Sequence, residues 1–201
     1  MKQTNNPLAA IRFIIAAIIL LAAPQLVMAQ VTYKLADGAD TYLKVSGTSN
    51  IHDWTMTSSS LESQGTFVKE GDDLSAIRAF TFQFAIKTLK SEHSSMDSRM
   101  NKAVNASKYP TVSYKLTSVT VTNILKGKYL LKTKGDLTFA GNTQAISMDV
   151  TAKVNADNTI TCSGTKKIQL TDYGIKPPSY MLGTMKVYND LTIQFNLIYK
   201  K

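Results

Sequence analysis

The sequence has few of the residues on which disulfide frameworks, metal centres and most catalytic sites depend. It holds one cysteine and two histidines in 201 residues. A single cysteine cannot form an intrachain disulfide or a cysteine-rich zinc site, and the two histidines are far apart, with no glutamate spaced for zinc ligation. The sequence also contains no glycine-rich phosphate loop and no G-x-S-x-G elbow. We therefore expect no metal and no cofactor.

Charged residues are also scarce, at 18% of the chain against a usual share of about 25%. Ser, Thr and Asn take the polar positions, which favours strands and turns over charged helices. The formal net charge of +9 has two interpretations: a solvated basic face, or a surface that attracts anionic headgroups or membranes. Nucleic acid is not an expected partner, since no helix-turn-helix or aromatic-basic interleaving occurs.

Acidic residues are absent from the N-terminal segment, which carries Lys2 and Arg12. Its apolar run, Ile11–Ala23, has 13 residues, fewer than the roughly 20 that span a bilayer as a helix. Small residues, Val27 and Ala29, then occupy the −3 and −1 positions of a cleavage site. This three-part pattern is typical of a secretory signal peptide, with an uncleaved anchor as the alternative.

Cleavage near Ala29 divides the chain into a signal peptide, residues 1–29, and a mature domain, residues 30–201. The mature domain has 172 residues, a size that suits one domain. Its net charge falls by two, from +9 to +7, because both basic residues of the signal are removed. We expect the mature protein to be periplasmic or secreted.

The strongest pattern in the mature chain is an alternation of apolar and polar residues with period two. In residues 79–87, Phe80, Phe82, Phe84 and Ile86 share one face. Such alternation is typical of strands with one buried face. Similar strands are predicted for residues 111–121, 128–140, 143–155, 158–170 and 191–199, and weaker ones for residues 42–47, 54–58 and 61–68. Short turn-forming links separate many of these strands, which predicts antiparallel neighbours.

One segment, residues 94–106, has helical instead of strand periodicity. Its apolar residues recur at i, i+4, i+7 and i+8, which places them on one face of a helix. These residues are Met96, Met100, Ala103 and Val104. Ser94 and Asp97 have the spacing of a capping box at the N-terminus of that helix. We therefore expect one short helix in an otherwise all-β chain.

About eight to ten antiparallel strands with one apolar face must bury that face against something. A two-sheet sandwich and a closed barrel would both do so, and an eight-stranded barrel can enclose one small ligand. The alternation alone leaves both architectures open. No repeat, linker or low-complexity tract divides the mature chain.

Several segments, taken in order, resemble the signatures of the YceI-like family. The first is Ser46–Met56, with the sequence SGTSNIHDWTM. The others are Leu61–Phe67, Ser95–Met100, Lys108–Tyr114, Gly135–Thr143, Tyr173–Ile175 and Val187–Leu197. Together they cover nearly all of residues 31–200.

This resemblance implies an extended lipocalin-like antiparallel β-barrel of about eight strands with one short helix near an end. It also implies a non-enzymatic binding protein, whose elongated apolar interior holds a polyisoprenoid chain or similar lipid in the periplasm. The residues expected to point inward and line that interior are Phe80, Phe82, Phe84, Ile86, Tyr114, Leu131, Leu137, Phe139, Met148, Ile193, Phe195 and Leu197.

Five further residues are candidates for the mouth of the barrel. They are His52, Trp54, Asp97, Arg99 and Met100. His52 and Asp53 are adjacent, and adjacent side chains of an extended strand point to opposite faces. We therefore interpret this pair as structural and not catalytic. Cys162 falls on the apolar face of its strand, which predicts a buried and inert thiol.

The same lining residues would also suit an ordinary filled core, so several alternatives stay open. A non-binding structural or stress-related envelope barrel is one. An outer-membrane barrel, which needs a polar interior, and an enzyme acting around His52 are others. Homodimerisation and transient contact with a membrane surface are also left open. A hollow interior would favour the lipid carrier over the structural barrel.

Overall fold

The computed structural model describes residues 30–38 and 40–201, and the expected signal peptide lies outside the described residues. The strands are β1 (Gln30–Leu35), β2 (Tyr42–Ser49), β3 (Asp53–Ser58), β4 (Glu62–Glu70), β5 (Asp73–Ala85), β6 (Thr111–Leu125), β7 (Lys128–Phe139), β8 (Asn142–Val154), β9 (Ile160–Gln169), β10 (Ser179–Tyr180) and β11 (Met185–Lys200). The helical elements are the 3₁₀ turns η1 (Ile86–Thr88), η2 (Leu170–Tyr173) and η3 (Met181–Gly183) and the α-helix α2 (Ser94–Ala103).

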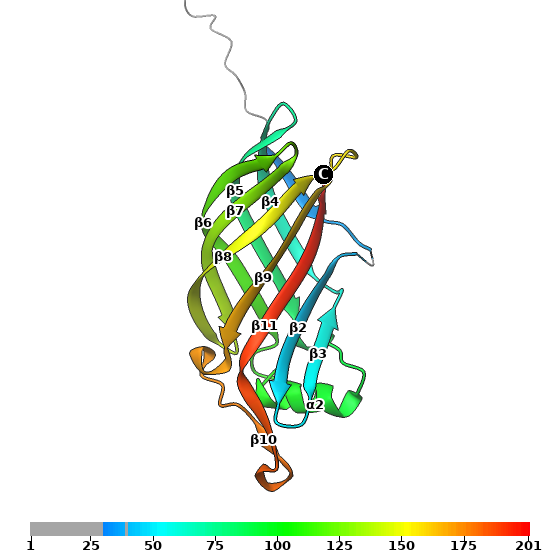
Figure 1. Cartoon of the computed structure of the whole chain (residues 1–201), viewed down its shortest axis with the longest axis vertical. Helices are drawn as coiled ribbons and strands as arrows, with labels where there is room; N and C mark the ends of the chain where they lie inside the picture. The colour runs from blue at the N-terminus through cyan, green and yellow to red at the C-terminus, as the bar shows by residue number, and fades with distance from the viewer. Residues whose placement is uncertain (1–29, 39) are drawn as a thin grey trace, which may run out of the picture.

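Eight strands form an antiparallel ring in the order β1-β4-β5-β6-β7-β8-β9-β11, and pairing between β1 and β11 closes it. The end of β11 pairs with β1, at Lys34↔Lys200, whereas its earlier part, Val187–Asn196, pairs with β2. β1 and β2 therefore lie one after the other along the same edge of β11, as Figure 1 shows. The expected all-β, lipocalin-like barrel is confirmed, and the two-sheet sandwich is excluded.

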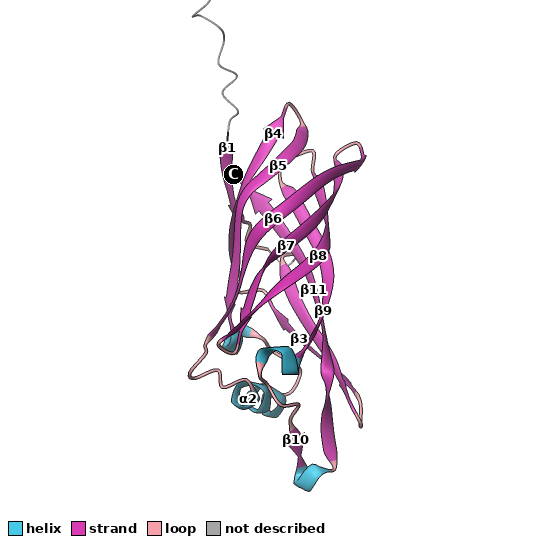
Figure 2. Ribbon diagram, turned by 90° about the vertical axis from the view of Figure 1, so that its left-hand side faces the viewer, coloured by secondary structure: helices cyan, strands magenta, loops and turns pink. Residues whose placement is uncertain are grey.

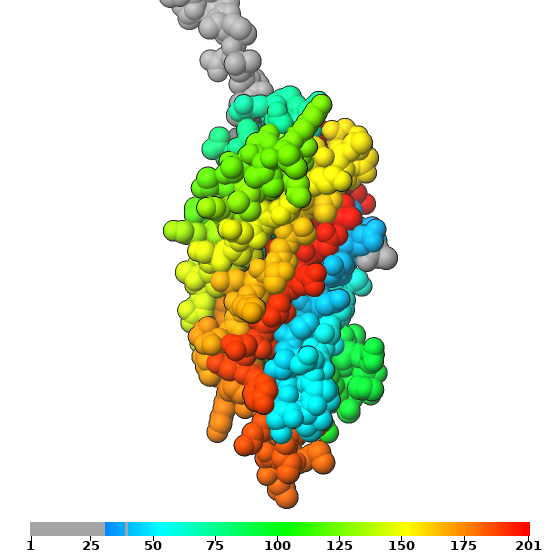
Figure 3. Space-filling view, viewed as in Figure 1, coloured from blue at the N-terminus to red at the C-terminus, as the bar shows by residue number. Residues whose placement is uncertain are grey.

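The barrel is elongated, with different structures at its two ends. The loops after β4, β6 and β8 and the C-terminus gather at one end, which we call the far end (Figure 1). The helix α2, the 3₁₀ turns and the β10–β11 hairpin gather at the other, which we call the helix end (Figure 2). Figure 3 shows β9, β11 and β2 as adjacent diagonal bands, coloured orange, red and blue, in the wall between them.

Aromatic side chains fill the far end of the barrel. Tyr33, Phe67 and Tyr199 are each at most 1% exposed, and Phe67 lies with its ring centre 5.3 Å from that of Tyr33 and 5.4 Å from that of Tyr199. The Tyr199 hydroxyl lies 2.7 Å from Ser63 Oγ, which satisfies it in this apolar layer. Buried aromatic rings of this size close the far end of the interior.

The helix α2 begins and ends differently from the sequence expectation. The predicted capping box is wrong: the N-cap is His93, and no side chain caps the helix there. The helix ends after Ala103, earlier than the expected residue 106, because Asn105 adopts a left-handed conformation with φ 52°. Met96 and Met100 pack against the core, as the helical periodicity predicts.

Two further details of the strands differ from the alternation pattern. The expected strand at residues 79–87 ends at Ala85, and Ile86 begins the 3₁₀ turn η1, where its N–H donates to Pro110 O at 2.8 Å. Ile86 is nevertheless 1% exposed, so its inward position holds. β1, which closes the ring, is a strand that the sequence pattern did not indicate. Among the described residues, no helix is long and apolar enough to cross a membrane.

Candidate ligand-binding cavity

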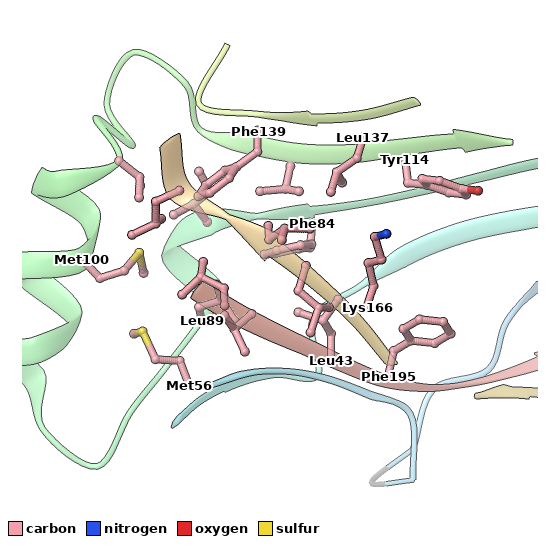
Figure 4. A pocket seen from close by; sticks show the side chains of 18 of the residues that line it. Leu43, Met56, Phe84, Leu89, Met100, Tyr114, Leu137, Phe139, Lys166 and Phe195 are labelled. Atoms are coloured by element: carbon pink, nitrogen blue, oxygen red, sulfur yellow. The ribbon is translucent and has the colours of Figure 1, made fainter. Parts of the chain in front are cut away.

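The interior of the barrel is hollow between the aromatic layer at the far end and α2 at the helix end. The cavity has a volume of about 340 Å³, within the range of small-molecule sites in proteins. All twelve residues expected to line the interior do line it: eleven lie on strands whose period-two alternation places their side chains inward, and Ile86 lies in the 3₁₀ turn η1. Figure 4 shows some of them, including Phe84, Leu137, Phe139 and Phe195, pointing into this space.

Pairs of glycines and aromatic residues help to keep the cavity open. Gly164 lies directly opposite Phe195 in the β9–β11 ladder, and a Cβ at Gly164 would lie 2.8 Å from that ring. Gly47 and Trp54 form an equivalent pair in the β2–β3 ladder, with a clash at 2.3 Å. Because glycine has no side chain, each ring can lie flat against the wall. Larger residues at these glycines would push the rings into the cavity.

The mouth of the cavity is covered by α2 and the segment around β10. Met100 and Arg99 line the cavity from α2, as expected for mouth residues. The Arg99 guanidinium lies 5.1 Å from the centre of the Tyr180 ring of β10, which also contributes to the lining. A cation over an aromatic face is attracted to it. This contact joins the helix to β10 across the helix end.

Asp97 was expected at the mouth, and the structure places it elsewhere. Its carboxylate faces away from the cavity and accepts hydrogen bonds of 2.8 Å from the backbone N–H and the hydroxyl of Ser91. Burial raises the pKa of Asp97, but the two hydrogen bonds from Ser91 and the nearby Lys90 outweigh it and hold the pKa below its usual value. Asp97 therefore anchors the loop before α2.

His52 and Trp54 both line the cavity near its mouth. His52 lies just before β3, and its Nδ1 is 2.8 Å from the backbone oxygen of Asp53, so the ring contacts the main chain and not the Asp53 carboxylate. Trp54 is half-buried, and its indole N–H is buried with no hydrogen-bond partner among the described residues. Neither residue belongs to a cluster that could hold a metal, and none occurs in residues 30–38 and 40–201.

Several polar residues that line the cavity were not predicted from the sequence, and two of them, Thr133 and Lys166, lie on the inner faces of strands. Thr133 has the same parity on β7 as Leu131 and Leu137, and Lys166 has the same parity on β9 as Cys162 and Ile168. Period-two alternation therefore places both residues on the inward face. They were not predicted because only the apolar residues of each face were selected as lining residues.

Apart from a few polar residues such as His52 and Arg99 near the mouth, the rest of the described lining is mostly hydrocarbon and sulfur. Cys162, expected to be buried and inert, is 4% exposed, and burial raises the pKa of its thiol to about 12. A thiol with so high a pKa holds little thiolate near neutral pH, so it is a weak nucleophile. The cavity is thus shaped to enclose an apolar molecule.

Comparison with known proteins assigns this barrel to a family. A family model described as the YceI-like domain matches residues 30–199. The chain belongs to the YceI-like family. A search of curated proteins finds no match. The matched residues include the whole barrel and the cavity lining, so the family assignment rests on the same part of the chain as the candidate site.

Solved structures share the YceI-like fold at low sequence identity. A polyisoprenoid binding domain from Saccharophagus degradans implicated in plant cell wall breakdown is 11% identical, with a TM-score of 0.63, covering 86% of this chain and 99% of that one. BcnA from Burkholderia cenocepacia is 17% identical, with a TM-score of 0.60 and coverages of 78% and 95%. The YCEI protein of Campylobacter jejuni is 17% identical, with a TM-score of 0.52 and coverages of 69% and 81%.

Proposed function

We propose that this protein binds an apolar lipid of the isoprenoid type inside its barrel, as a carrier and not as an enzyme. The observation that carries the proposal is the cavity of about 340 Å³ with an almost wholly apolar lining. A filled core would have favoured a purely structural barrel. The similar fold of a domain whose name describes it as polyisoprenoid binding is consistent with such a ligand.

The energetics of the cavity suit a hydrocarbon chain. Each buried CH₂ group contributes about 0.8 kcal/mol, so a few isoprene units offset the cost of immobilising the chain. A hydrocarbon forms no hydrogen bonds, so this part of the site would select ligands by length and width. The methionines at the mouth, Met56, Met96 and Met100, have flexible side chains that fit branched chains of varied shape.

A cavity-filling substitution tests the proposal. Ile193→Trp enlarges a side chain of the lining on β11 and should lower the affinity for farnesol at least about tenfold, because the indole occupies the space of the ligand. Thr192→Trp, on the outer face of the same strand, is the matched control and should bind like the wild type. Calorimetric titration measures both. Equal binding by the two variants would place the ligand outside the barrel.

We also propose that the helix end contacts membrane surfaces, from which the lipid would be taken. Met181 and Leu182 lie at the tip of the β10–β11 hairpin, which projects beyond the barrel at this end in Figures 1 and 2, and are 67% and 108% exposed. Ile51 is 57% exposed on a neighbouring loop. The backbone N–H of Lys186 in β11 donates to Asn50 Oδ1, which joins this loop to the β10–β11 hairpin. The net positive charge of the chain favours an anionic lipid surface.

The proposed site of action is the periplasm or the extracellular space. It rests on the signal-peptide pattern, with cleavage near Ala29. The family model begins at residue 30, directly after that cleavage site, which is consistent with a separate N-terminal segment.

A further inference from the structure

Lys166 is a charged residue in the wall of an apolar cavity. It lies on the inward face of β9, between Gly164 and Ile168, and lines the cavity. Figure 4 shows its nitrogen among the carbon side chains of the lining. The ion pair formed by the described residues joins Lys90 and Asp97, so Lys166 has no carboxylate partner within residues 30–38 and 40–201. Lys166 is half-exposed, so its ammonium is not sealed from water and is available to an anionic group that enters the cavity.

Lys166 lies where two neighbouring strands stop pairing. The β8–β9 ladder runs from Val154↔Ile160 to Val150↔Gly164 and ends there. Beyond this point the carbonyl of Ser147 has no backbone donor from β9, and Lys166 Nζ donates to it at 2.9 Å. An ammonium has three N–H donors. One is used by Ser147, which leaves two for another acceptor.

Two hydroxyl groups line the cavity from β7 and β6, which lie two and three strands away from β9 in the sheet. Thr133 on β7 lies opposite Met148 on β8 and donates to its carbonyl at 2.9 Å, so Thr133 and Lys166 bind consecutive carbonyls of β8 from opposite sides. Tyr114 on β6 lies over Gly135, where a Cβ would be 2.4 Å from its hydroxyl oxygen. Gly135 is two residues from Thr133 on the same inward face of β7.

The Tyr114 hydroxyl is a donor without an acceptor. Its side chain is 6% exposed and lines the cavity, and the oxygen has no hydrogen-bond partner among the described residues. Burial raises the pKa of Tyr114 more than the nearby Thr133 hydroxyl lowers it, so the phenol keeps its proton and can donate it. Buried polar groups in proteins are nearly always hydrogen-bonded. An unpaired donor facing a ligand cavity therefore indicates an acceptor on the ligand.

We propose that the Tyr114 hydroxyl and the Lys166 ammonium form a polar subsite in the cavity wall that binds an anionic oxygen group of the lipid. The ammonium of Lys166 and the hydroxyl of Tyr114 donate to a carboxylate or phosphate oxygen, and the apolar lining encloses the attached chain. This inference rests on the proposed lipid-binding function and names its ligand more closely. The protein then distinguishes an acidic lipid from the neutral alcohol with the same chain.

Three farnesyl compounds test the subsite: farnesol, farnesoic acid and farnesyl phosphate. Calorimetric titration of the wild-type protein should show at least one of the two anions binding about 10- to 100-fold more tightly than farnesol, the range expected for one charge-assisted hydrogen bond. The anion with the larger preference identifies the headgroup as carboxylate or phosphate. Lys166→Met should abolish this preference for the anion over farnesol.

Matched variants separate this role from a structural one. Lys167→Met removes the same charge from the exposed face of β9 and should keep the preference for the anion. Tyr114→Phe keeps the ring over Gly135, should reduce the preference, and tests the subsite if Lys166→Met does not fold. An unchanged preference in both Lys166→Met and Tyr114→Phe overturns the subsite, as does an equal loss of farnesol and anion. Failure of the wild type to bind any of the three overturns the proposed function itself.

Discussion

Cys162 shows how burial in the barrel changes the chemistry of one residue. Its thiol faces the cavity from β9, and burial raises its pKa from the ordinary 9.0 to about 12. The unfolded chain therefore loses this proton near pH 9, whereas the folded protein keeps it until about pH 12. Because the folded state binds more protons between these values, the free energy of unfolding must fall as the pH rises above 9.

A cysteine substitution tests this linkage. When the pH rises from 9 to 10, the free energy of unfolding should fall in both proteins. The fall should be about 1 kcal/mol smaller in Cys162→Ala than in the wild type, because the alanine variant has no thiol to titrate. Urea unfolding at the two pH values measures the difference. Iodoacetamide provides a control, since it should modify Cys162 only after unfolding. Rapid modification of the folded protein would show that the thiol is accessible.

Individual residues of the cavity differ in how far the sequence alone could predict their positions. Inward residues such as Phe84, Leu137 and Ile193 could be predicted because strand parity is a local property that alternation displays. Asp97 could not be placed, because its acceptor role depends on Ser91, which lies before α2 in a loop of irregular structure. The unpaired hydroxyl of Tyr114 depends on neighbours from two other strands and is visible only in three dimensions.

At the scale of elements, the pairing of strands that are distant in the sequence closes the wall of the barrel. β1 and β2 both pair with β11. β1 pairs with the C-terminal end of β11, and β2 pairs with its earlier part. β3 continues the wall toward the helix end, where Thr57 bridges Lys90 just after η1. The sequence indicated most of the strands, but ring closure depends on pairing between residues near positions 34 and 200, which no local pattern encodes.

The β10–β11 hairpin has an unusual tip. Met181 and Leu182 both adopt positive φ angles, 52° and 56°, although such left-handed conformations cost about 1–2 kcal/mol for residues other than glycine. Both side chains are also exposed to water. Strained residues tend to occur at functional positions, and this tip lies beside the mouth of the cavity.

A charge at this tip should weaken membrane contact. Leu182→Asp should reduce co-sedimentation with vesicles of phosphatidylethanolamine and phosphatidylglycerol at least about tenfold, because a leucine side chain contributes about 1.5–3 kcal/mol on burial. Ser179→Asp adds the same charge at an exposed position of β10 without removing an apolar side chain, and should retain most of the binding. Identical sedimentation of Leu182→Asp and the wild type would contradict membrane insertion by the tip.

At the scale of the whole molecule, the barrel has one closed end, an apolar cavity and a covered mouth at the opposite end. The aromatic layer of Tyr33, Phe67 and Tyr199 closes the far end. Glycine–aromatic pairs such as Gly164 and Phe195 keep the cavity open. The contact between Arg99 and Tyr180 holds α2 against β10 at the mouth. The covered mouth of the cavity therefore lies at the same end of the barrel as the exposed hairpin tip.

The central claim is that the cavity holds a lipid, and native mass spectrometry of the mature protein tests it most directly. The protein should be expressed as the full chain and purified without detergent from the periplasmic and culture-medium fractions. We expect a population heavier than residues 30–201 alone by the mass of one lipid. Organic extraction should release this lipid, and Ile193→Trp should abolish the heavier population. A protein that is consistently empty, and stays empty after incubation with farnesol, farnesoic acid and longer polyprenyl lipids, would contradict the account.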